Sequence, residues 1–249
     1  MLKRTLASIA GRLGYEIRRK PKPLEGIPDA QAYRPLFCPW IADRAFEQTI
    51  VGLQDKTLVT VDRLHVLYTL ARQAARLAGE FWECGVFRGG TALLLARVLS
   101  DLQPRGTRLR LFDTFQGMPE TDPARDRHRQ GDFSQTDLQR VKNLLPQPFV
   151  AFHPGTIPHT FADLGRSRLA FVHLDVDIYG SYRDCLEFVY PRLVPGGFIV
   201  CDDYGFPSCP GARRATDEFF AHRPERPLIL GTGQAVIVKM PVAEERSCQ

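Results

Sequence analysis

The chain has 249 residues and a mass of 28.1 kDa, enough for one large domain or two small ones. Hydrophobic residues make up 44% of it, which excludes global disorder. No apolar run approaches the ~20 residues that span a bilayer, and the N-terminus lacks the apolar centre of a signal peptide. Six cysteines are scattered without a CxxC pair, which predicts reduced thiols and a cytoplasmic protein.

The positive charge is concentrated at the N-terminus. Of the net charge of +5, residues 1–22 contribute seven positive side chains and one negative, so the rest of the chain is close to neutral. A neutral body has no broad basic face, and no zinc-finger spacing or RNA-binding aromatic motif is present. We therefore expect no nucleic-acid partner.

Residues 1–22 also predict a basic amphipathic helix, because Leu2, Leu6, Ile9 and Leu13 recur at spacings of three and four. Such a helix fits peripheral contact with an anionic membrane surface at the inner face of the membrane. The alternative is a helix that packs on its own body or on a second subunit of a homo-oligomer, because ordinary surface helices show the same apolar stripe. Prolines then predict that residues 23–56 form a linker and N-terminal extension.

Residues 57–240 predict one doubly wound α/β domain, and residues 241–249 a C-terminal tail. A helical pattern runs from about residue 57 to Leu77, and short apolar runs then alternate with helical stretches, as in a mostly parallel sheet with helices on both faces. Two final runs, separated by Gly231–Gln234, predict a hairpin at the sheet edge. The seven expected strands are 81–84, 109–112, 149–152, 169–174, 198–201, 228–230 and 235–238.

The first strand-to-helix corner reads ECGVFRGGT, residues 83–91. Its glycines, at GxxxGG spacing, depart from the GxGxxG of dinucleotide sites, and the acid Glu83 would repel a phosphate but attract a sulfonium. This pattern favours S-adenosylmethionine, although a glycine turn that merely closes the strand–helix joint is the alternative. The predicted donor-binding residues in this corner are Glu83, Gly85, Arg88, Gly89 and Thr91.

The second strand ends at Asp113, 23 residues beyond Gly90. An acid at this position can accept hydrogen bonds from ribose hydroxyls. Alternatively, its side chain caps the turn that follows. Asp132 and Ser134 are further candidates, for contact with the purine, unless they cap a loop.

Three acids end the fourth and fifth strands: Asp175, Asp202 and Asp203. The carboxyl ends of parallel strands meet at one edge, so these carboxylates can converge and bind a hard divalent cation, with Mg2+ favoured over zinc. The alternative is that Asp177 and Asp202 cap turns and only one acid faces the cleft. His173, within the fourth strand, is interpreted as a hydrogen-bonded core histidine.

Five motifs follow one another along the chain: ECGVFRGG at 83–90, FDTFQGMP at 112–119, GDFS at 131–134, HLDVDIYGS at 173–181 and LVPGGFIVCDDYG at 193–205. This ordered set resembles the macrocin O-methyltransferase family of Mg2+-dependent sugar O-methyltransferases, over roughly residues 55–240. The resemblance implies a class I methyltransferase (Rossmann-like) sheet of seven strands, S-adenosylmethionine as methyl donor, and one metal held by Asp175, Asp202 and Asp203.

The predicted reaction is methylation of a sugar hydroxyl on a glycosylated secondary metabolite or glycan. The cation stabilises the developing alkoxide, and Asp175 is the predicted catalytic base. One alternative is a catechol-type phenol O-methyltransferase, which uses a metal ion in the same way. A catalytically inactive interaction protein that retains the fold is another.

Overall fold

The computed structural model describes residues 38–241 except 105 and 107. Contacts divide the chain into two units, Met1–Cys38 and Pro39–Gln249, and the second contains every element described below. The predicted helix of residues 1–22, the start of the predicted linker and the end of the tail lie outside the described residues. Within the described part of the chain, no helix has the length and apolar character needed to cross a membrane.

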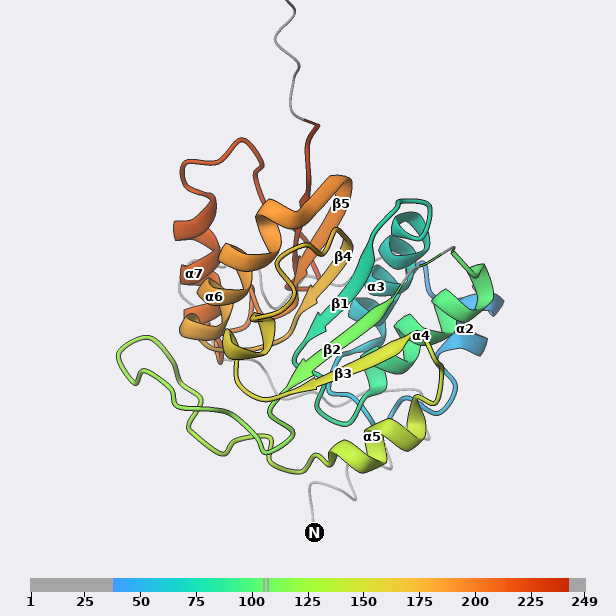
Figure 1. The fold of residues 1–249 in the computed structure, drawn as a ribbon, viewed down its shortest axis with the longest axis horizontal. Helices are drawn as coiled ribbons and strands as arrows, with labels where there is room; N and C mark the ends of the chain where they lie inside the picture. The colour runs from blue at the N-terminus through green and yellow to red at the C-terminus, as the bar shows by residue number, and fades with distance from the viewer. Residues whose placement is uncertain (1–37, 105, 107, 242–249) are drawn as a thin grey trace, which may run out of the picture. The chain divides into compact units, whose positions relative to one another are not determined.

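A seven-stranded sheet forms the centre of the unit, in the order β3-β2-β1-β4-β5-β7-β6 (Figure 1). The first five strands are parallel, whereas β7 runs antiparallel to both of its neighbours. This confirms the mostly parallel sheet and the edge hairpin predicted from the sequence. The strands are β1 (Glu80–Cys84), β2 (Leu109–Asp113), β3 (Val150–Pro154), β4 (Leu169–Leu174), β5 (Leu193–Cys201), β6 (Leu228–Ile229) and β7 (Ala235–Val238).

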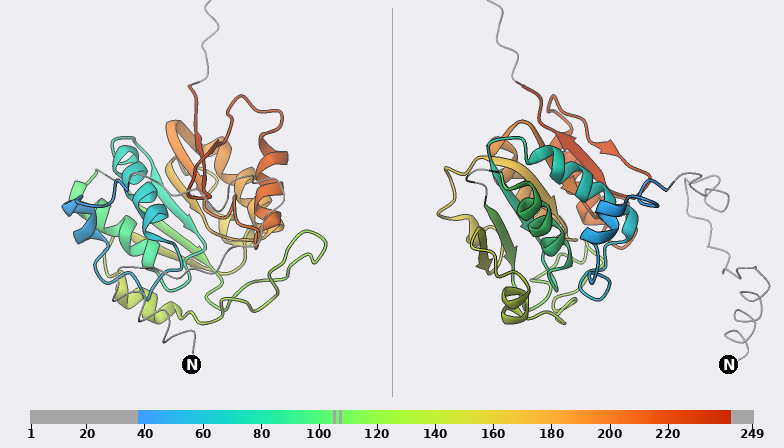
Figure 2. Two further views of the ribbon diagram at one scale, coloured as in Figure 1. Left: turned by 180° about the vertical axis from the view of Figure 1, so that it is seen from behind. Right: turned by 90° about the vertical axis from the view of Figure 1, so that its right-hand side faces the viewer.

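Helices cover both faces of the sheet, so each face buries its own apolar core (Figure 2). On one side the core contains Phe81 and Phe171 of the sheet together with α2, α3, α4 and α5; on the other it contains Trp82 and Val172 together with α6 and α7. The helices are α2 (Arg44–Thr49), α3 (Val61–Ala74), α4 (Gly90–Leu102), α5 (Leu138–Leu144), α6 (Tyr179–Val189) and α7 (Pro210–Phe220), with short 3₁₀ turns at His159–Phe161 and Tyr190–Arg192.

Two segments differ from the expectation. Part of the predicted linker forms helix α2, because Asp43 caps it and Phe46 is completely buried in the core. The fifth strand, expected at 198–201, begins at Leu193, so the Pro195–Gly197 segment lies within β5, where the pairing with β4 shifts register. Gly196, with φ of +79°, lets the strand bulge at this point.

The connections place a ligand-binding edge at the carboxyl ends of β1 and β4. From β1 the chain continues to β2 and β3 on one side of the sheet, whereas β4 and β5 lie on the other side. The reversal in strand order therefore falls between β1 and β4. Open α/β sheets bind their ligands at such a switch point, because the loops diverge there and leave a crevice.

Candidate active site

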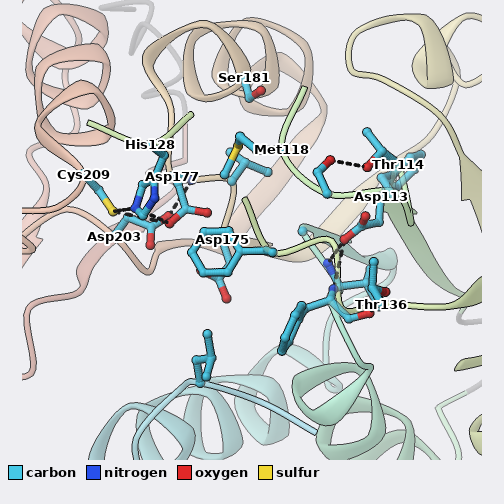
Figure 3. A pocket seen from close by; sticks show the side chains of 18 of the residues that line it. Asp113, Thr114, Met118, His128, Thr136, Asp175, Asp177, Ser181, Asp203 and Cys209 are labelled. Atoms are coloured by element: carbon cyan, nitrogen blue, oxygen red, sulfur yellow. Dashed lines mark hydrogen bonds and ion pairs between the residues drawn. The ribbon is translucent and has the colours of Figure 1, made fainter. Parts of the chain in front are cut away.

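One cavity occupies this edge of the sheet (Figure 3). We call its two parts the turn side and the acidic side. The turn side consists of the first strand-to-helix corner and the ends of β2 and β3, with Gly85, Val86, Phe87, Thr91, Phe112, Asp113, Thr114, Gly155, Thr156 and Ile157 on its wall. The acidic side contains Arg63, His128, Asp175, Asp177, Ser181, Asp203, Phe206, Ser208 and Cys209.

The glycines of the first corner are required by close packing. Gly85 has φ of +87°, and a Cβ there would overlap the carbonyl oxygen of Asp175 at the end of β4. Gly89 has φ of +84°, and a Cβ there would lie 2.9 Å from the Val141 side chain of α5. Gly85 lies on the cavity wall and Gly89 does not, so the joint-closing interpretation holds for Gly89.

Arg88 and Thr91 occupy different environments. Thr91 is buried on the cavity wall. The Arg88 guanidinium points away from the cavity and donates to the backbone carbonyls of Gln135, at 2.8 Å, and Asp55, at 3.4 Å. The structure thus places Thr91, but not the side chain of Arg88, where a ligand in the cavity could meet it.

Asp113 caps the first corner from the neighbouring strand. Its Oδ2 accepts hydrogen bonds from the backbone N–H groups of Val86 and Phe87, at 2.7 and 2.9 Å, and its Oδ1 accepts from Phe115 N–H at 2.6 Å. The turn-capping interpretation is therefore confirmed. Asp113 also lies on the cavity wall, and Oδ1, with one donor here, retains a free lone pair.

Asp132 and Ser134 do not lie on the cavity wall. Oδ2 of Asp132 accepts from the backbone N–H of Arg129 at 2.9 Å, as in the loop-cap alternative, and lies 3.3 Å from His128 Nδ1. From the same segment, Phe133 and Thr136 face the cavity instead. The sequence motif thus located the correct loop but not the side chains that face inward.

Glu83 lies beneath the cavity. The register of β1 and β4 sets it opposite His173, and both side chains are completely buried. His173 Nδ1 and Glu83 Oε1 are 2.9 Å apart, whereas Glu83 Oε2 has no hydrogen-bond partner. The interpretation of His173 as a hydrogen-bonded core residue is confirmed. Glu83 is paired with His173 and is not on the cavity wall, so at this position it makes no direct contact with the cavity.

Three carboxylates converge on the acidic side: Asp175, Asp177 and Asp203. Burial, followed by the charge of Asp203, raises the pKa of Asp175 and of Asp177 well above the ordinary value. Burial and the charge of Asp202 raise the pKa of Asp203 to about 6. The three carboxyl groups therefore resist ionising together unless a cation joins them.

Asp203 is held in place by its neighbours. Its Oδ2 accepts hydrogen bonds from the backbone N–H of Asp177 and from the Tyr182 hydroxyl, both at 3.0 Å. Tyr182, completely buried in α6, also donates to the carbonyl of Leu174 at 2.8 Å. The orientation of this carboxylate is thus fixed by the protein alone.

Asp202 differs from the other acids because it is already paired. It forms a buried ion pair with Arg63 of α3, and its Oδ1 accepts from Gln234 Nε2 at 2.7 Å. Burial opposes its ionisation, but the hydrogen bond and charge of His173 and the charge of Arg63 outweigh burial and lower its pKa. Asp202 is fully buried and is not on the cavity wall.

The donor set nevertheless fits a hard cation. One ligand atom each of His173, Asp175 and Asp202 lie within 4.8 Å of one another, and Asp203 lies on the same cavity wall as Asp175. Carboxylates whose charges repel one another are the environment in which Mg2+ binds with net gain. With Asp202 paired to Arg63, Asp175 and Asp203 are the carboxylates of the predicted set that face the cavity.

Sequence reasoning missed Arg63, His128 and Cys209. They come from α3, the loop after β2 and the start of α7, and only the packing of these segments brings them together. No spacing in the sequence indicates that these three residues lie close together. The Glu83–His173 pair did have a signal, because each residue stands one position before the end of its strand.

The chain resembles known proteins over most of the described unit. The family model of macrocin-O-methyltransferase (TylF) matches residues 51–230. The chain is 31% identical to mycinamicin III 3''-O-methyltransferase of Micromonospora griseorubida over 179 residues, 66% of this chain and 69% of that protein. It is 35% identical to 8-demethyl-8-(2,3-dimethoxy-alpha-L-rhamnosyl)-tetracenomycin-C 4'-O-methyltransferase of Streptomyces olivaceus over 144 residues.

This second match covers 53% of the chain and only 55% of the Streptomyces olivaceus protein. Among solved structures, that of the O-methyltransferase NovP superposes with a TM-score of 0.68 at 26% sequence identity. The superposition covers 75% of this chain and 83% of that one. The sheet and its helices are thus those of an O-methyltransferase structure.

Proposed function

Because the chain belongs to the macrocin-O-methyltransferase family, we propose that it transfers a methyl group from S-adenosylmethionine to a sugar hydroxyl, in a Mg2+-dependent reaction. The acceptor is a glycosylated secondary metabolite or a glycan. Two relatives support this class of acceptor, because their names specify methylation of mycinamicin III and of a rhamnosyl tetracenomycin.

One observation carries the proposal: the turn side and the acidic side share a single cavity. A methyl donor on the turn side and a hydroxyl on the acidic side would meet near Asp175, which Figure 3 shows between Asp113 and Asp177. Methyl transfer needs the reacting atoms in line at ~3 to 3.5 Å, and a common cavity allows this alignment.

On the turn side, Asp113 and the backbone around Gly85 would bind the donor. Asp113 is fixed by three backbone N–H groups, and its remaining Oδ1 lone pair can accept from a ribose hydroxyl. The fixed geometry lowers the entropy that is lost on binding. Glu83, buried below the corner and paired with His173, would support the strand that carries the corner rather than contact the donor.

On the acidic side, Asp175 and Asp203 would hold Mg2+, together with Asp202 if Arg63 releases it. When bound, Mg2+ supplies the positive charge that lowers the pKa of a nearby hydroxyl. The protein itself orients Asp203 through Tyr182, and Arg63 neutralises Asp202. The four acids thereby divide into one that is internally neutralised and three that face the cavity.

We propose Asp175 as the group that takes the acceptor proton, because its carboxylate lies on the cavity wall beside the turn side. Asp177 is the competing carboxylate. It lies on the same wall, with its backbone N–H bound to Asp203, and is not in the proposed metal set. Asparagine variants of the two residues, assayed at saturating Mg2+, distinguish the base from a carboxylate that only positions the acceptor.

The polar character of the acidic side favours a sugar over a catechol. His128, Ser181 and Ser208 offer hydrogen-bonding groups to the space beyond Asp177, and Phe206 adds one aromatic wall. A slot for a planar phenol would need apolar walls on both sides of the ring. The lining therefore suits the many hydroxyls of a glycoside.

The test is turnover of S-adenosylmethionine with a panel of glycosides that carry vicinal hydroxyls, with catechol as comparison. We expect methylation of glycosides, complete loss of turnover in EDTA, and recovery on addition of Mg2+. Turnover that persists in EDTA would show that the reaction does not require Mg2+. Donor binding without turnover of any acceptor, with Mg2+ present, would favour the inactive interaction protein.

We also propose that residues 1–22 attach the enzyme to an anionic membrane surface, because seven of these residues are basic. Full-length protein and a variant that lacks residues 1–22 are compared by flotation with liposomes containing anionic lipid. We expect only the full-length protein to float, and less of it at high salt. Equal flotation of both would assign the segment to contact with protein, for example in a homo-oligomer.

A further inference from the structure

A second set of metal-binding side chains lies on the acidic side, beyond the carboxylates assigned to Mg2+. It consists of His128, Asp177 and Cys209. Cys209 Sγ lies 3.3 Å from Asp177 Oδ1 and 3.6 Å from His128 Nε2, and His128 Nε2 lies 3.7 Å from Asp177 Oδ1. Figure 3 shows the three side chains pointing toward one another.

These separations match the edges of a tetrahedral zinc site. Zinc binds sulfur at ~2.3 Å, imidazole nitrogen at ~2.0 to 2.1 Å and carboxylate oxygen at ~2.0 to 2.2 Å. At tetrahedral angles these bonds set the ligand atoms roughly 3.3 to 3.6 Å apart. A zinc ion therefore fits among the three atoms with movements of only a few tenths of an ångström.

The three side chains are held from different directions by the fold. The loop that carries His128 is anchored at Asp126, whose Oδ1 accepts from Tyr179 N–H at 2.8 Å. Asp177 is fixed by the bond of its backbone N–H to Asp203, at 3.0 Å. Cys209 stands at the N-cap position directly before α7 and is buried. The set is thus largely formed without an ion.

A fourth residue orients the histidine. Asp132 Oδ2 lies 3.3 Å from His128 Nδ1, the ring nitrogen that faces away from Cys209. Zinc-binding histidines commonly donate their second ring N–H to a carboxylate, which fixes the tautomer and leaves the other nitrogen as the ligand. This gives Asp132, predicted from the sequence as a purine contact, a different function.

We infer that His128, Asp177 and Cys209 form a second cation site that takes Zn2+ or a similar borderline divalent ion. On binding, the thiol of Cys209 loses its proton to solvent and forms a bond from sulfur to the metal. The thiolate and carboxylate then balance the charge of the ion. All three ligands line the cavity, so the fourth position of the tetrahedron is open to the acceptor or to water.

The chemistry of the ligands separates this site from the Mg2+ site. Thiolate and imidazole select zinc, whereas the carboxylate oxygens of Asp175 and Asp203 suit Mg2+. A role for Cys209 as a nucleophile is disfavoured, because burial and the charges of Asp203 and Asp177 raise its pKa and keep the thiol neutral when no metal is bound.

The experiment measures metal binding by the full-length protein, stripped with chelator, in excess Mg2+ and without donor or acceptor. Zn2+ affinity is obtained by competition with a chromophoric chelator, and Co2+ reports the ligands through its absorption spectrum. We expect a Co2+ spectrum with a sulfur-to-metal band. We expect at least tenfold weaker Zn2+ binding in Cys209→Ser and His128→Ala, and about 10- to 100-fold weaker binding in Asp132→Asn.

Three matched variants serve as controls: Cys38→Ser, His222→Ala and Asp175→Asn should keep the wild-type Zn2+ affinity, and circular dichroism checks that every variant folds. Unchanged affinity in both Cys209→Ser and His128→Ala overturns the inference. So does a Co2+ spectrum without the sulfur band, or a loss of Zn2+ binding in Asp175→Asn alone. None of these results depends on methyl transfer, so the proposed function stands or fails separately.

Discussion

The two sides of the cavity are built on different principles. On the turn side, the polar groups are satisfied within the protein: Asp113 binds three backbone N–H groups, and the corner around Gly85 is fixed by contact with β4. On the acidic side, Asp175, Asp177 and Asp203 face the cavity with raised pKa values, whereas Asp202, behind the wall, is paired with Arg63.

This contrast indicates which kind of ligand each side of the cavity binds. A satisfied, rigid surface binds a partner of fixed shape with little loss of entropy, as the nucleoside part of a donor requires. A surface with excess negative charge lowers its free energy by taking up a cation. Substitutions should therefore act in opposite ways: on the turn side they cost affinity and stability, and on the acidic side some of them gain stability while activity is lost.

Among the substitutions considered, Asp175→Asn on the acidic side should have the largest effect on activity. We expect turnover to fall by about 10²- to 10⁴-fold, the range for a lost general base, with donor affinity nearly unchanged. The pKa of Asp175 is raised, so its ionised form disfavours the fold at neutral pH, and its replacement should increase the free energy of unfolding of the metal-free protein.

The measurements are turnover at saturating Mg2+, donor affinity by calorimetry and denaturant unfolding in EDTA. Because the penalty grows as pH rises above the ordinary aspartate pKa, the gain in stability should be smaller at pH 4 than at pH 7. Loss of donor affinity equal to the loss of rate would contradict the assignment of Asp175 to the chemistry.

Arg63→Gln should show how much Asp202 depends on its partner. It removes the guanidinium from a fully buried carboxylate and leaves His173, 3.4 Å from Asp202 Oδ1, as the remaining cationic neighbour, so we expect a cost of up to about 3–5 kcal/mol. The matched control is Arg72→Gln on the same helix, whose exposed pair with Asp101 is worth at most about 1 kcal/mol. Denaturant unfolding with and without Mg2+ gives both values.

Mg2+ should restore part of the stability lost in Arg63→Gln, because a cation bound between Asp175 and Asp202 replaces the missing guanidinium charge. No such restoration is expected in the Arg72→Gln control. If Mg2+ stabilises both variants equally, Asp202 is not part of the cation site, and Asp175 and Asp203 alone define it.

The sequence predicted the turn side better than the acidic side. Strand ends, the glycine corner and Asp113 follow from local patterns, because apolar runs and glycine spacing act over a few residues. The acids directly follow the ends of β4 and β5, as expected, although Asp202 does not face the cavity. Which of them is neutralised was not predictable, because Arg63 reaches Asp202 from a helix that precedes it by more than 130 positions.

The local sequence also could not predict whether a side chain in a loop points into the cavity or away from it. Asp132 and Ser134 have side chains that could bind a purine, but the loop directs Phe133 and Thr136 into the cavity instead. In a strand, alternation fixes the direction of each side chain, but an irregular loop has no period. Glu83 shows the complementary case, because strand geometry alone aims it away from the cavity and at His173.

The smallest effect should come from Asp113→Asn, which tests whether the turn side acts through its fixed hydrogen bonds. The amide can keep one oxygen acceptor but loses the charge that receives the Val86 and Phe87 N–H groups. Hydrogen bonds to a charged group are worth about 1.5–3 kcal/mol, so we expect donor affinity to fall by roughly 10- to 100-fold. Turnover at saturating donor should change little, because the acidic side is untouched.

Asp43→Asn is the matched control, since Asp43 accepts a backbone N–H at the start of α2 and is not on the cavity wall. A loss of stability shared by both variants, with donor affinity intact in Asp113→Asn, would reduce Asp113 to a cap and leave the ribose without its proposed acceptor.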